Sequence, residues 1–77
     1  MQVTLHAVGY LKKYISRQTQ SIQVDITPET TVRALLEQLT IPENEVLRVA
    51  VNDQIVPYDY SLKDGDEVRV IPPIAGG

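Results

Sequence analysis

The sequence predicts one α+β domain in which a mixed sheet of four or five strands packs one face against a single main helix. Two segments, residues 2–8 and 21–26, alternate apolar and polar side chains as half-buried strands do. Residues 30–42 carry leucines at helical spacing, and further apolar segments follow them. A chain of 77 residues has room for one small core.

Two strands and a short helical turn are predicted before the main helix. Residues 2–8 form the first strand, residues 10–15 the turn, residues 16–20 a loop and residues 21–26 the second strand. The side chains expected to face inward are Val3, Leu5, Ala7, Tyr10, Leu11, Tyr14, Ile15, Ile22, Val24 and Ile26.

The main helix is predicted between an N-cap at Thr30 and a stop at Pro42. Its apolar stripe consists of Val32, Leu35, Leu36 and Leu39. Such a helix is about nine residues long, below the ~12 to 15 at which an isolated helix becomes marginally stable. It therefore has to lie on the sheet.

Three strands are predicted after the helix. The first spans residues 46–52 with three inward side chains, and the turn residues Asn52 and Asp53 lead into a short strand at residues 54–56. Asp64 and Gly65 mark another turn before the last strand. The inward side chains of these strands are Leu47, Val49, Val51, Val68 and Val70.

This order of elements favours the β-grasp, or ubiquitin-like, topology. Sequential strands usually pair, and the crossover connection through a helix is right-handed, so a sheet grasping one helix is the economical arrangement. We expect residues 1–71 to form the domain and residues 72–77 to form an extended tail.

Composition narrows the classes of function. The absence of cysteine excludes disulfides, thiolate nucleophiles and cysteine metal sites. A net charge of −3 without a long basic cluster argues against binding to nucleic acid. No apolar run approaches the ~20 residues of a membrane span, and the N-terminus lacks the pattern of a signal peptide. We expect a soluble cytoplasmic protein with no membrane partner.

Several side chains could act in catalysis or metal binding, but a structural role explains each of them more simply. His6 is the sole histidine and has no companion ligand, so we interpret it as an exposed surface residue and expect no metal site. The acidic residues of "DGDE", Asp64, Asp66 and Glu67, suit a solvated turn before an edge strand. The tyrosines at positions 10, 14, 58 and 60 are expected to pack at the edge of the core, and the cations at positions 12, 13 and 17 to be solvated.

The C-terminal segment is the strongest candidate for function. Pro72 and Pro73 fix φ near about −65° and favour an extended chain from Ile71 onward, so that the six residues from Pro72 could span ~20 Å. Gly76 and Gly77 have no side chains and could enter a narrow tunnel, carrying an ionised α-carboxylate at the tip. The alternative is a frayed terminus, as most chain ends are.

Residues 62–77, "LKDGDEVRVIPPIAGG", resemble the C-terminal segment of the molybdopterin synthase small subunit and related ubiquitin-like sulfur carriers. The family pattern runs Leu-x-Asp-Gly-Asp-x-Val, then an apolar strand, Pro-Pro, an apolar residue, a small residue and Gly-Gly. Here these places are held by Leu62, Asp64, Gly65, Asp66, Val68, Val70, Ile71, Pro72, Pro73, Ile74, Ala75, Gly76 and Gly77. Residues 49–53, "VAVND", are similar to the family's preceding strand and turn, which often ends in Asn-Gly.

The resemblance implies a carrier and not an enzyme. A ubiquitin-activating-type adenylating enzyme would consume ATP to adenylate the Gly77 carboxylate, and a persulfide would convert it to a thiocarboxylate. A large molybdopterin synthase subunit, or another sulfur-acceptor enzyme, would then receive the sulfur. The resemblance assigns partner contacts to Ile71, Pro72, Pro73, Ile74, Ala75 and Gly76. No permanently bound cofactor is expected.

Other functions remain open at this point. The same carrier chemistry could serve synthesis of the thiamine thiazole, of cysteine or of a tungsten cofactor. A ubiquitin-like modifier would share the activation step but join Gly77 to lysines of other proteins. A non-covalent β-grasp interaction module would use an exposed face of its sheet instead.

Overall fold

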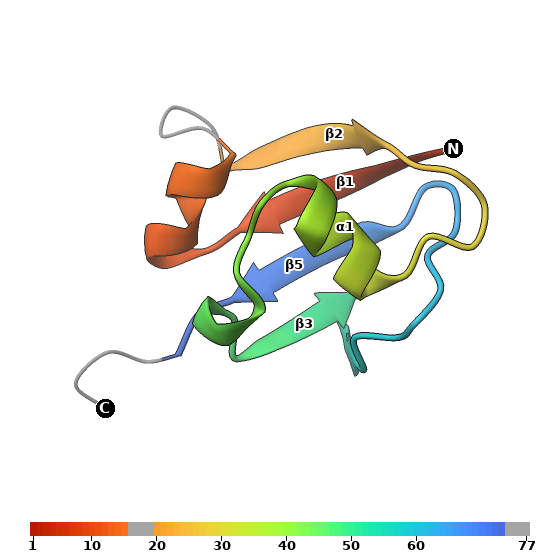
Figure 1. The fold of residues 1–77 in the computed structure, drawn as a ribbon. Helices are drawn as coiled ribbons and strands as arrows, with labels where there is room; N and C mark the ends of the chain where they lie inside the picture. Colours follow the sequence, from red (N-terminus) through yellow and green to blue (C-terminus); the bar gives the residue numbers. More distant parts are fainter. Residues whose placement is uncertain (16–19, 74–77) are drawn as a thin grey trace.

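The computed structural model describes residues 1–15 and 20–73, and in this part of the chain five strands form one sheet in the order β2-β1-β5-β3-β4 (Figure 1). The strands are β1 (Gln2–Ala7), β2 (Ser21–Asp25), β3 (Arg48–Val51), β4 (Gln54–Val56) and β5 (Glu67–Ile71). One α-helix, α1 (Val32–Gln38), and two 3₁₀ helices, η1 (Gly9–Tyr14) and η2 (Glu43–Glu45), complete the described elements.

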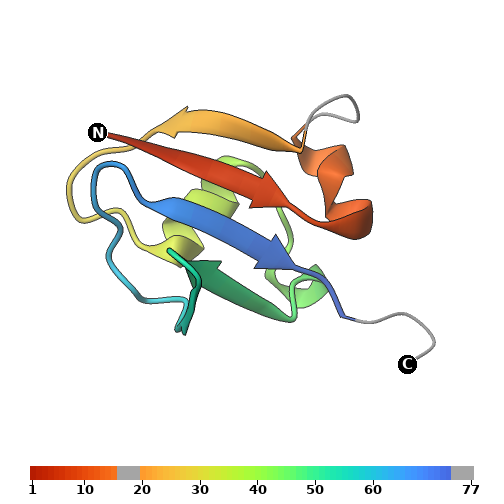
Figure 2. The same cartoon turned by 180° about the vertical axis from the view of Figure 1, so that it is seen from behind.

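The sheet is mixed. β1 runs parallel to β5 and antiparallel to β2, while β3 runs antiparallel to both β5 and β4. The first and last strands of the chain therefore lie side by side in the middle of the sheet (Figure 2). The predicted α+β class and β-grasp topology are confirmed.

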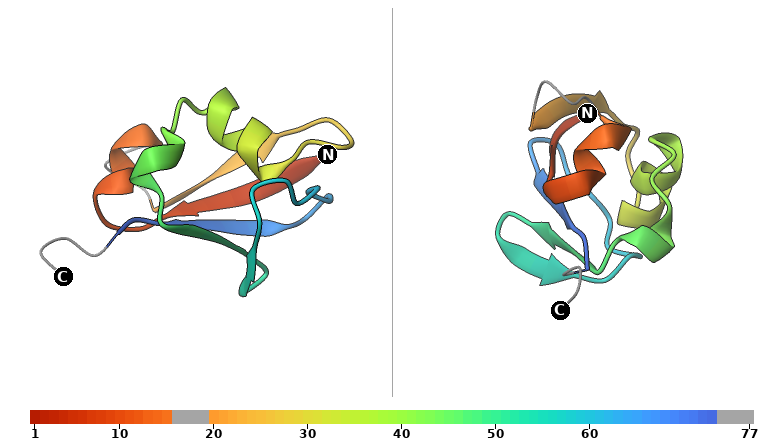
Figure 3. Two further views of the ribbon diagram at one scale, coloured as in Figure 1. Left: turned by 60° about the horizontal axis from the view of Figure 1, so that its bottom comes forward. Right: turned by 90° about the vertical axis from the view of Figure 1, so that its left-hand side faces the viewer.

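The helices lie on one side of the sheet. Figure 3 shows α1, η1 and η2 above the strands, with no described element on the other side. The apolar stripe of α1 and the inward side chains of the strands form a single core, as the alternation patterns predict. Its largest fully buried side chains are Val3, Leu5, Leu11, Val32, Leu35, Leu36, Val49, Val68 and Val70.

The ends of α1 differ from the prediction. The N-cap is Thr31 and not Thr30, because the Thr31 hydroxyl accepts a hydrogen bond from Ala34 N–H at 3.1 Å, while the Thr30 hydroxyl donates to Thr27 C=O at 2.8 Å. The helix also ends at Gln38, before Pro42, because Thr40 adopts a φ of 57° that a helix cannot continue.

Two predicted core residues are exposed. Leu47 is 49% exposed because β3 begins only at Arg48, and the neighbouring Val46 is buried in its place. Tyr10 is 46% exposed, because η1 is a 3₁₀ helix and places Leu11, Tyr14 and Ile15 against the core instead.

The predicted turns are confirmed, but one turn residue has a different role. Asn52 and Asp53 have φ values of 51° and 69°, and Gly65 has a φ of 85°. Asp66, which we expected to be a solvated residue before an edge strand, is buried at 6% exposure and leads into the central strand β5. The predicted loop at residues 16–20 lies mostly outside the described residues.

Candidate functional site

The last described residues leave the end of β5. The carbonyl of Ile71 accepts a hydrogen bond from Leu47 N–H at 2.8 Å, which holds the strand to β3 up to its last residue. Pro72 is half-buried and Pro73 is exposed. The other predicted site residues, Ile74, Ala75, Gly76 and Gly77, lie outside the described residues, so their roles and the predicted tail stay predictions.

Pro72 lies against the start of η1. Gly9 has a φ of +61°, and a Cβ at Gly9 would stand 3.5 Å from Cγ of Pro72. Val8 follows Ala7, which pairs with Val70, and so lies next to the end of β5. The chain segments before η1 and before β3 thus flank the point where β5 leaves the sheet.

Exposed apolar side chains gather at this point. Val8, Tyr10 and Leu47 are 41 to 49% exposed, and they are three of the five exposed large apolar residues in residues 1–15 and 20–73. The Tyr10 hydroxyl donates to Glu45 C=O at 3.4 Å, which brings η1 beside the chain leading to Leu47. We call the surface formed by Val8, Gly9, Tyr10, Leu47, Ile71 and Pro72 the tail root.

Basic side chains border the tail root. Lys12 and Lys13 line an open hollow of about 300 Å³ together with Gly9 and Tyr10, and Arg48 pairs with Ile71 across the sheet. The Lys13 ammonium lies 3.9 Å from Glu45 and 5.2 Å from the centre of the Tyr14 ring. The border of the tail root therefore carries both cations and the carboxylate of Glu45.

Glu45 also sets the titration of Tyr14. The Tyr14 hydroxyl donates to the Glu45 carboxylate at 2.8 Å, and this hydrogen bond, with burial and the carboxylate charge, raises the pKa of Tyr14 above its ordinary value. The contact ties η1 to η2 next to the tail root.

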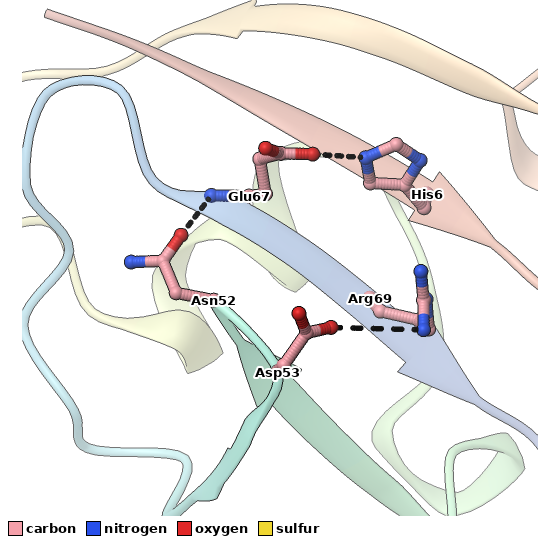
Figure 4. A pocket seen from close by; sticks show the side chains of 5 residues that line it. All are labelled: His6, Asn52, Asp53, Glu67 and Arg69. Atoms are coloured by element: carbon pink, nitrogen blue, oxygen red, sulfur yellow. Dashed lines mark hydrogen bonds and ion pairs between the residues drawn. The ribbon is translucent and has the colours of Figure 1, made fainter.

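A second candidate site lies on the face of the sheet away from the helix. Figure 4 shows a pocket of about 130 Å³ lined by His6, Asn52, Asp53, Glu67 and Arg69. His6 Nε2 lies 3.1 Å from Glu67 Oε1, and Arg69 lies 4.0 Å from Asp53. His6 is on the predicted polar face, but it is half-buried and paired, not simply exposed.

The chemistry of this pocket is limited. Its charged side chains already face partners of opposite charge, and its lining offers neither a hydroxyl nor a thiol nucleophile. Within the described residues no group of three His, Cys, Asp or Glu side chains could hold a metal ion. We assign no catalytic role to this pocket.

Sequence reasoning predicted partner contacts at Ile71, Pro72 and Pro73, and these roles stay predictions. It did not single out the other tail-root residues as a site. Val8 and Tyr10 were taken as parts of a strand and a packed turn, and Leu47 as a core residue. Gly9 between two predicted elements was the available signal, because a glycine there permits a positive φ and close packing. In the described part of the chain, α1, η1 and η2 are all too short to cross a membrane.

Solved structures of other proteins have the same fold as this chain. The Haloferax volcanii small archaeal modifier protein 1 superposes with a TM-score of 0.77 at 18% identity, covering 95% of this chain and 98% of that one. One chain of a solved complex of subunits 1 and 2 of the molybdopterin-converting factor from Helicobacter pylori matches with a TM-score of 0.66 at 24% identity, over the full length of both chains. These likenesses confirm the ubiquitin-like fold.

Sequence comparison identifies the family. The molybdopterin synthase sulfur carrier subunit of Escherichia coli strain K12 is 49% identical over 35 residues, which is 46% of this chain and 43% of that protein. The aligned region thus spans less than half the length of this curated relative. The sequence model of the ThiS family matches residues 9–77, which is most of the chain, and the chain therefore belongs to the ThiS family.

Proposed function

We propose that this chain is a sulfur carrier whose C-terminal carboxylate, on Gly77, is adenylated and then converted to a thiocarboxylate. The observation that carries the proposal is the family match, which extends through the Gly-Gly end at residues 76–77. The fold supports it, because central strand β5 continues into Pro72 and Pro73 with its last carbonyl still bonded to Leu47. A rigid sheet thus holds the start of the tail.

The proposed chemistry takes place in two stages. A carboxylate oxygen of Gly77 attacks the α-phosphorus of ATP on an adenylating enzyme, and pyrophosphate leaves to give an acyl-adenylate. A persulfide sulfur then attacks the acyl carbon and AMP leaves. A thiol reductant finally cleaves the resulting acyl disulfide and leaves the thiocarboxylate on Gly77.

The catalytic groups in this scheme belong to the partner enzymes. The chain has no cysteine that could intercept the activated acyl group. Its own contribution is to hold and present the tail, and glycine at positions 76 and 77 adds no side chain that would block a narrow active site. The chain itself keeps no bound cofactor in this scheme.

Molybdopterin synthesis is the acceptor pathway that we propose. The Pro72 and Pro73 step matches the molybdopterin-type pattern, and the Escherichia coli relative is named as a molybdopterin synthase sulfur carrier subunit. The solved Helicobacter pylori protein is described as a complex of subunits 1 and 2 of a molybdopterin-converting factor. By analogy, a large synthase subunit would receive the sulfur from Gly77.

Intact mass spectrometry tests the activation step. After incubation with ATP, a persulfide source and the cognate adenylating enzyme, we expect one oxygen of the chain to be replaced by sulfur. A variant lacking Gly77 is the control and should gain no sulfur. An unchanged wild-type mass with an adenylating enzyme that is active on another carrier would refute the proposal.

A second measurement identifies the acceptor. The thiocarboxylated chain should transfer its sulfur to a pterin precursor when the large synthase subunit is added, and return to its original mass. Transfer to a thiazole or cysteine precursor instead would place the chain in another branch of the family. Covalent adducts with lysines in cell extract would identify it as a protein modifier.

A further inference from the structure

We propose that the chain associates with a second copy of itself through the free edge of β2, so that the two sheets join into one. β2 is the outermost strand on one side of the sheet, and β1 separates it from β5 and the tail (Figure 1). The proposal therefore goes beyond sulfur carriage and does not depend on it.

Two hydrogen bonds at the ends of β2 define which backbone groups bond to β1. Ala7 N–H donates to Gln20 C=O at 3.0 Å, just before β2, and Ile26 N–H donates to Met1 C=O at 2.7 Å, just after it. In an antiparallel pair, residues bonded to the neighbouring strand alternate with residues whose N–H and C=O point away from it. Both bonds fix the same alternation from opposite ends of β2.

This alternation leaves three residues of β2 with backbone groups that point to the outer edge of the sheet. Ile22 and Val24 bond to β1, opposite Leu5 and Val3. The N–H and C=O groups that point outward therefore belong to Ser21, Gln23 and Asp25. Such a row of backbone groups is a template for pairing with another strand.

This edge lacks the features that usually prevent strand pairing. The register of β2 with β1 is continuous, so no bulge twists the edge away, and β2 contains neither lysine nor proline. Within residues 1–15 and 20–73, the one hydrogen bond to the outward backbone groups comes from the Gln38 side chain, which donates to Asp25 C=O at 3.2 Å. A carbonyl oxygen can accept a second bond.

The opposite edge of the sheet is less suited to pairing. The tight turn before β4 makes the first residue of that strand, Gln54, a hydrogen-bonded partner of Val51. By the same alternation, only Ile55 within β4 turns its backbone groups outward. Pro57 follows and has no N–H to donate. A partner strand would thus find fewer free groups on β4 than on β2.

The sequence of β2 favours an antiparallel register centred on Gln23. A two-fold axis through this residue pairs Gln23 with its counterpart and Ser21 with Asp25, so every outward-facing residue gains a hydrogen-bonded partner. In this register the carboxylate of Asp25 meets a hydroxyl group. A register centred on Asp25 would instead place two like charges opposite each other.

The two faces of the joined sheet also match in polarity. On the helix side, the half-buried Ile22 would lie opposite the buried Val24 of the second copy. On the other side, the amide group of Gln23 would lie opposite an identical amide, which can both donate and accept a hydrogen bond. The alternation that fits β2 to its own core therefore also fits it to a second β2.

The dimer should be weak and should leave both tails accessible. One strand from each copy supplies the contact, so the buried area lies below the roughly 1,200 Å² of stable interfaces. The tail leaves from β5, which β1 separates from the joined edge. A dimer of this kind forms at high local concentration and presents two C-terminal segments.

Amide hydrogen exchange, measured by NMR on the full chain at about 0.05 mM and 1 mM, tests the strand pairing. The amides of Ser21, Gln23 and Asp25 should exchange at least about twofold more slowly at the higher concentration. The amides of Ile22 and Val24, which already bond to β1, should not change. Association without this alternating pattern would overturn the proposal.

A charge swap tests the two-fold axis. Gln23→Lys and Gln23→Glu each place two like charges opposite each other, so each variant alone should associate about 5-fold more weakly than the wild-type chain. An equimolar mixture of the two variants should associate at least as strongly as the wild type, because opposite charges then meet. Sedimentation equilibrium measures all of these.

The matched controls are Gln54→Lys and Gln54→Glu, which make the same changes on the exposed edge strand β4. They should associate as the wild-type chain does. Gln23 and Gln54 are both exposed, so none of the four variants should unfold the domain, and circular dichroism verifies this.

Each result of these experiments supports or overturns the proposal. A wild-type chain that stays monomeric up to about 1 mM would overturn it. Weakening by the Gln54 variants in place of the Gln23 variants would assign the contact to β4, and a charge-swapped mixture that fails to associate would exclude the two-fold register. Sulfur loading of Gly77 is measured separately by mass, so these outcomes leave the proposed function unaffected.

Discussion

At the scale of single residues, the side chain of Asp66 connects two turns. One is the turn between β3 and β4 that contains Asn52, and the other is the turn before β5 that contains Gly65. Its carboxylate accepts from Lys63 N–H at 2.8 Å and from the Asn52 side-chain amide at 3.0 Å. The Asn52 amide oxygen in turn accepts from Glu67 N–H at 3.0 Å. A buried carboxylate that satisfies several donors stabilises the geometry of both turns.

Asp66→Asn should lower the free energy of unfolding by about 1 to 3 kcal/mol, because the new amide group places a donor against one of the donors that Asp66 satisfies. Asp53→Asn is the matched control. It removes the same charge from a residue whose side chain is 89% exposed, and should change stability by less than about 0.5 kcal/mol. Urea denaturation measures both, and equal effects would contradict the assigned role of Asp66.

Tyr14 should make stability fall at alkaline pH. Its raised pKa means that the folded chain holds the phenolic proton more tightly than the unfolded chain does, mainly through the hydrogen bond to Glu45. Stability from this contact is therefore fully present below about pH 10 and is lost as pH rises through the folded value.

Denaturation curves between about pH 8 and 11.5 test this expectation. Tyr14→Phe removes the titrating group, and Glu45→Gln removes the charge that the phenolate would face. Both variants should lose stability with pH less steeply than the wild-type chain. A wild-type slope retained in Tyr14→Phe would assign the alkaline loss to another group.

At the scale of elements, the end of α1 is stabilised by a Schellman arrangement. Thr40 N–H donates to Glu37 C=O at 3.1 Å and Ile41 N–H donates to Leu36 C=O at 2.9 Å, around the positive φ of Thr40. A β-branched residue is strained in this conformation, which glycine adopts without cost.

Thr40→Gly should therefore raise the free energy of unfolding by about 1 kcal/mol, which is the strain relieved at the left-handed position. The matched control is Ala34→Gly in the exposed interior of α1, where glycine should cost about 0.5 to 1 kcal/mol. Thermal unfolding of the two variants should shift in opposite directions. A loss of stability in both would contradict the conformation described for Thr40.

Periodicity in the sequence predicted the elements but not their ends. The alternation of Val3, Leu5 and Ala7 and the leucine stripe of α1 reflect burial in the core, so they identify strands and helix reliably. The ends depend on the backbone conformation of single residues. The sequence alone does not distinguish the threonine that caps α1, Thr31, from Thr30, or show that Thr40 adopts a left-handed conformation.

The same limit applies to the candidate site. Pro72 and Pro73 predicted an extended exit because proline restricts the backbone locally. The tail root is made by Gly9, Tyr10 and Leu47 from distant parts of the sequence, and only the pairing of β5 with β1 and β3 brings them together. The burial of Asp66 was not predicted for a related reason, because the strand that follows it, β5, is central in the sheet and not at its edge.

At the scale of the whole molecule, the boundary between domain and tail can be tested by truncation. A chain ending after Pro73 keeps every described contact, so its thermal midpoint should lie within about 4 °C of the wild-type value. A chain ending after Val70 loses the Ile71 bond to Leu47 and the contact of Pro72 with Gly9, and should melt markedly lower. Equal midpoints for the two truncations would place the boundary before Ile71.

The parallel pairing of β1 with β5 gives the sheet a mechanical property. A partner that pulls on the tail transmits force to β5, which lies between β1 and β3 and is bonded to both. Because the pull is directed along the strand, it loads these hydrogen bonds together in shear, whereas a pull across the strands would break them one after another. A force applied along the chain beyond Ile71 is therefore resisted by β1 and β3 together.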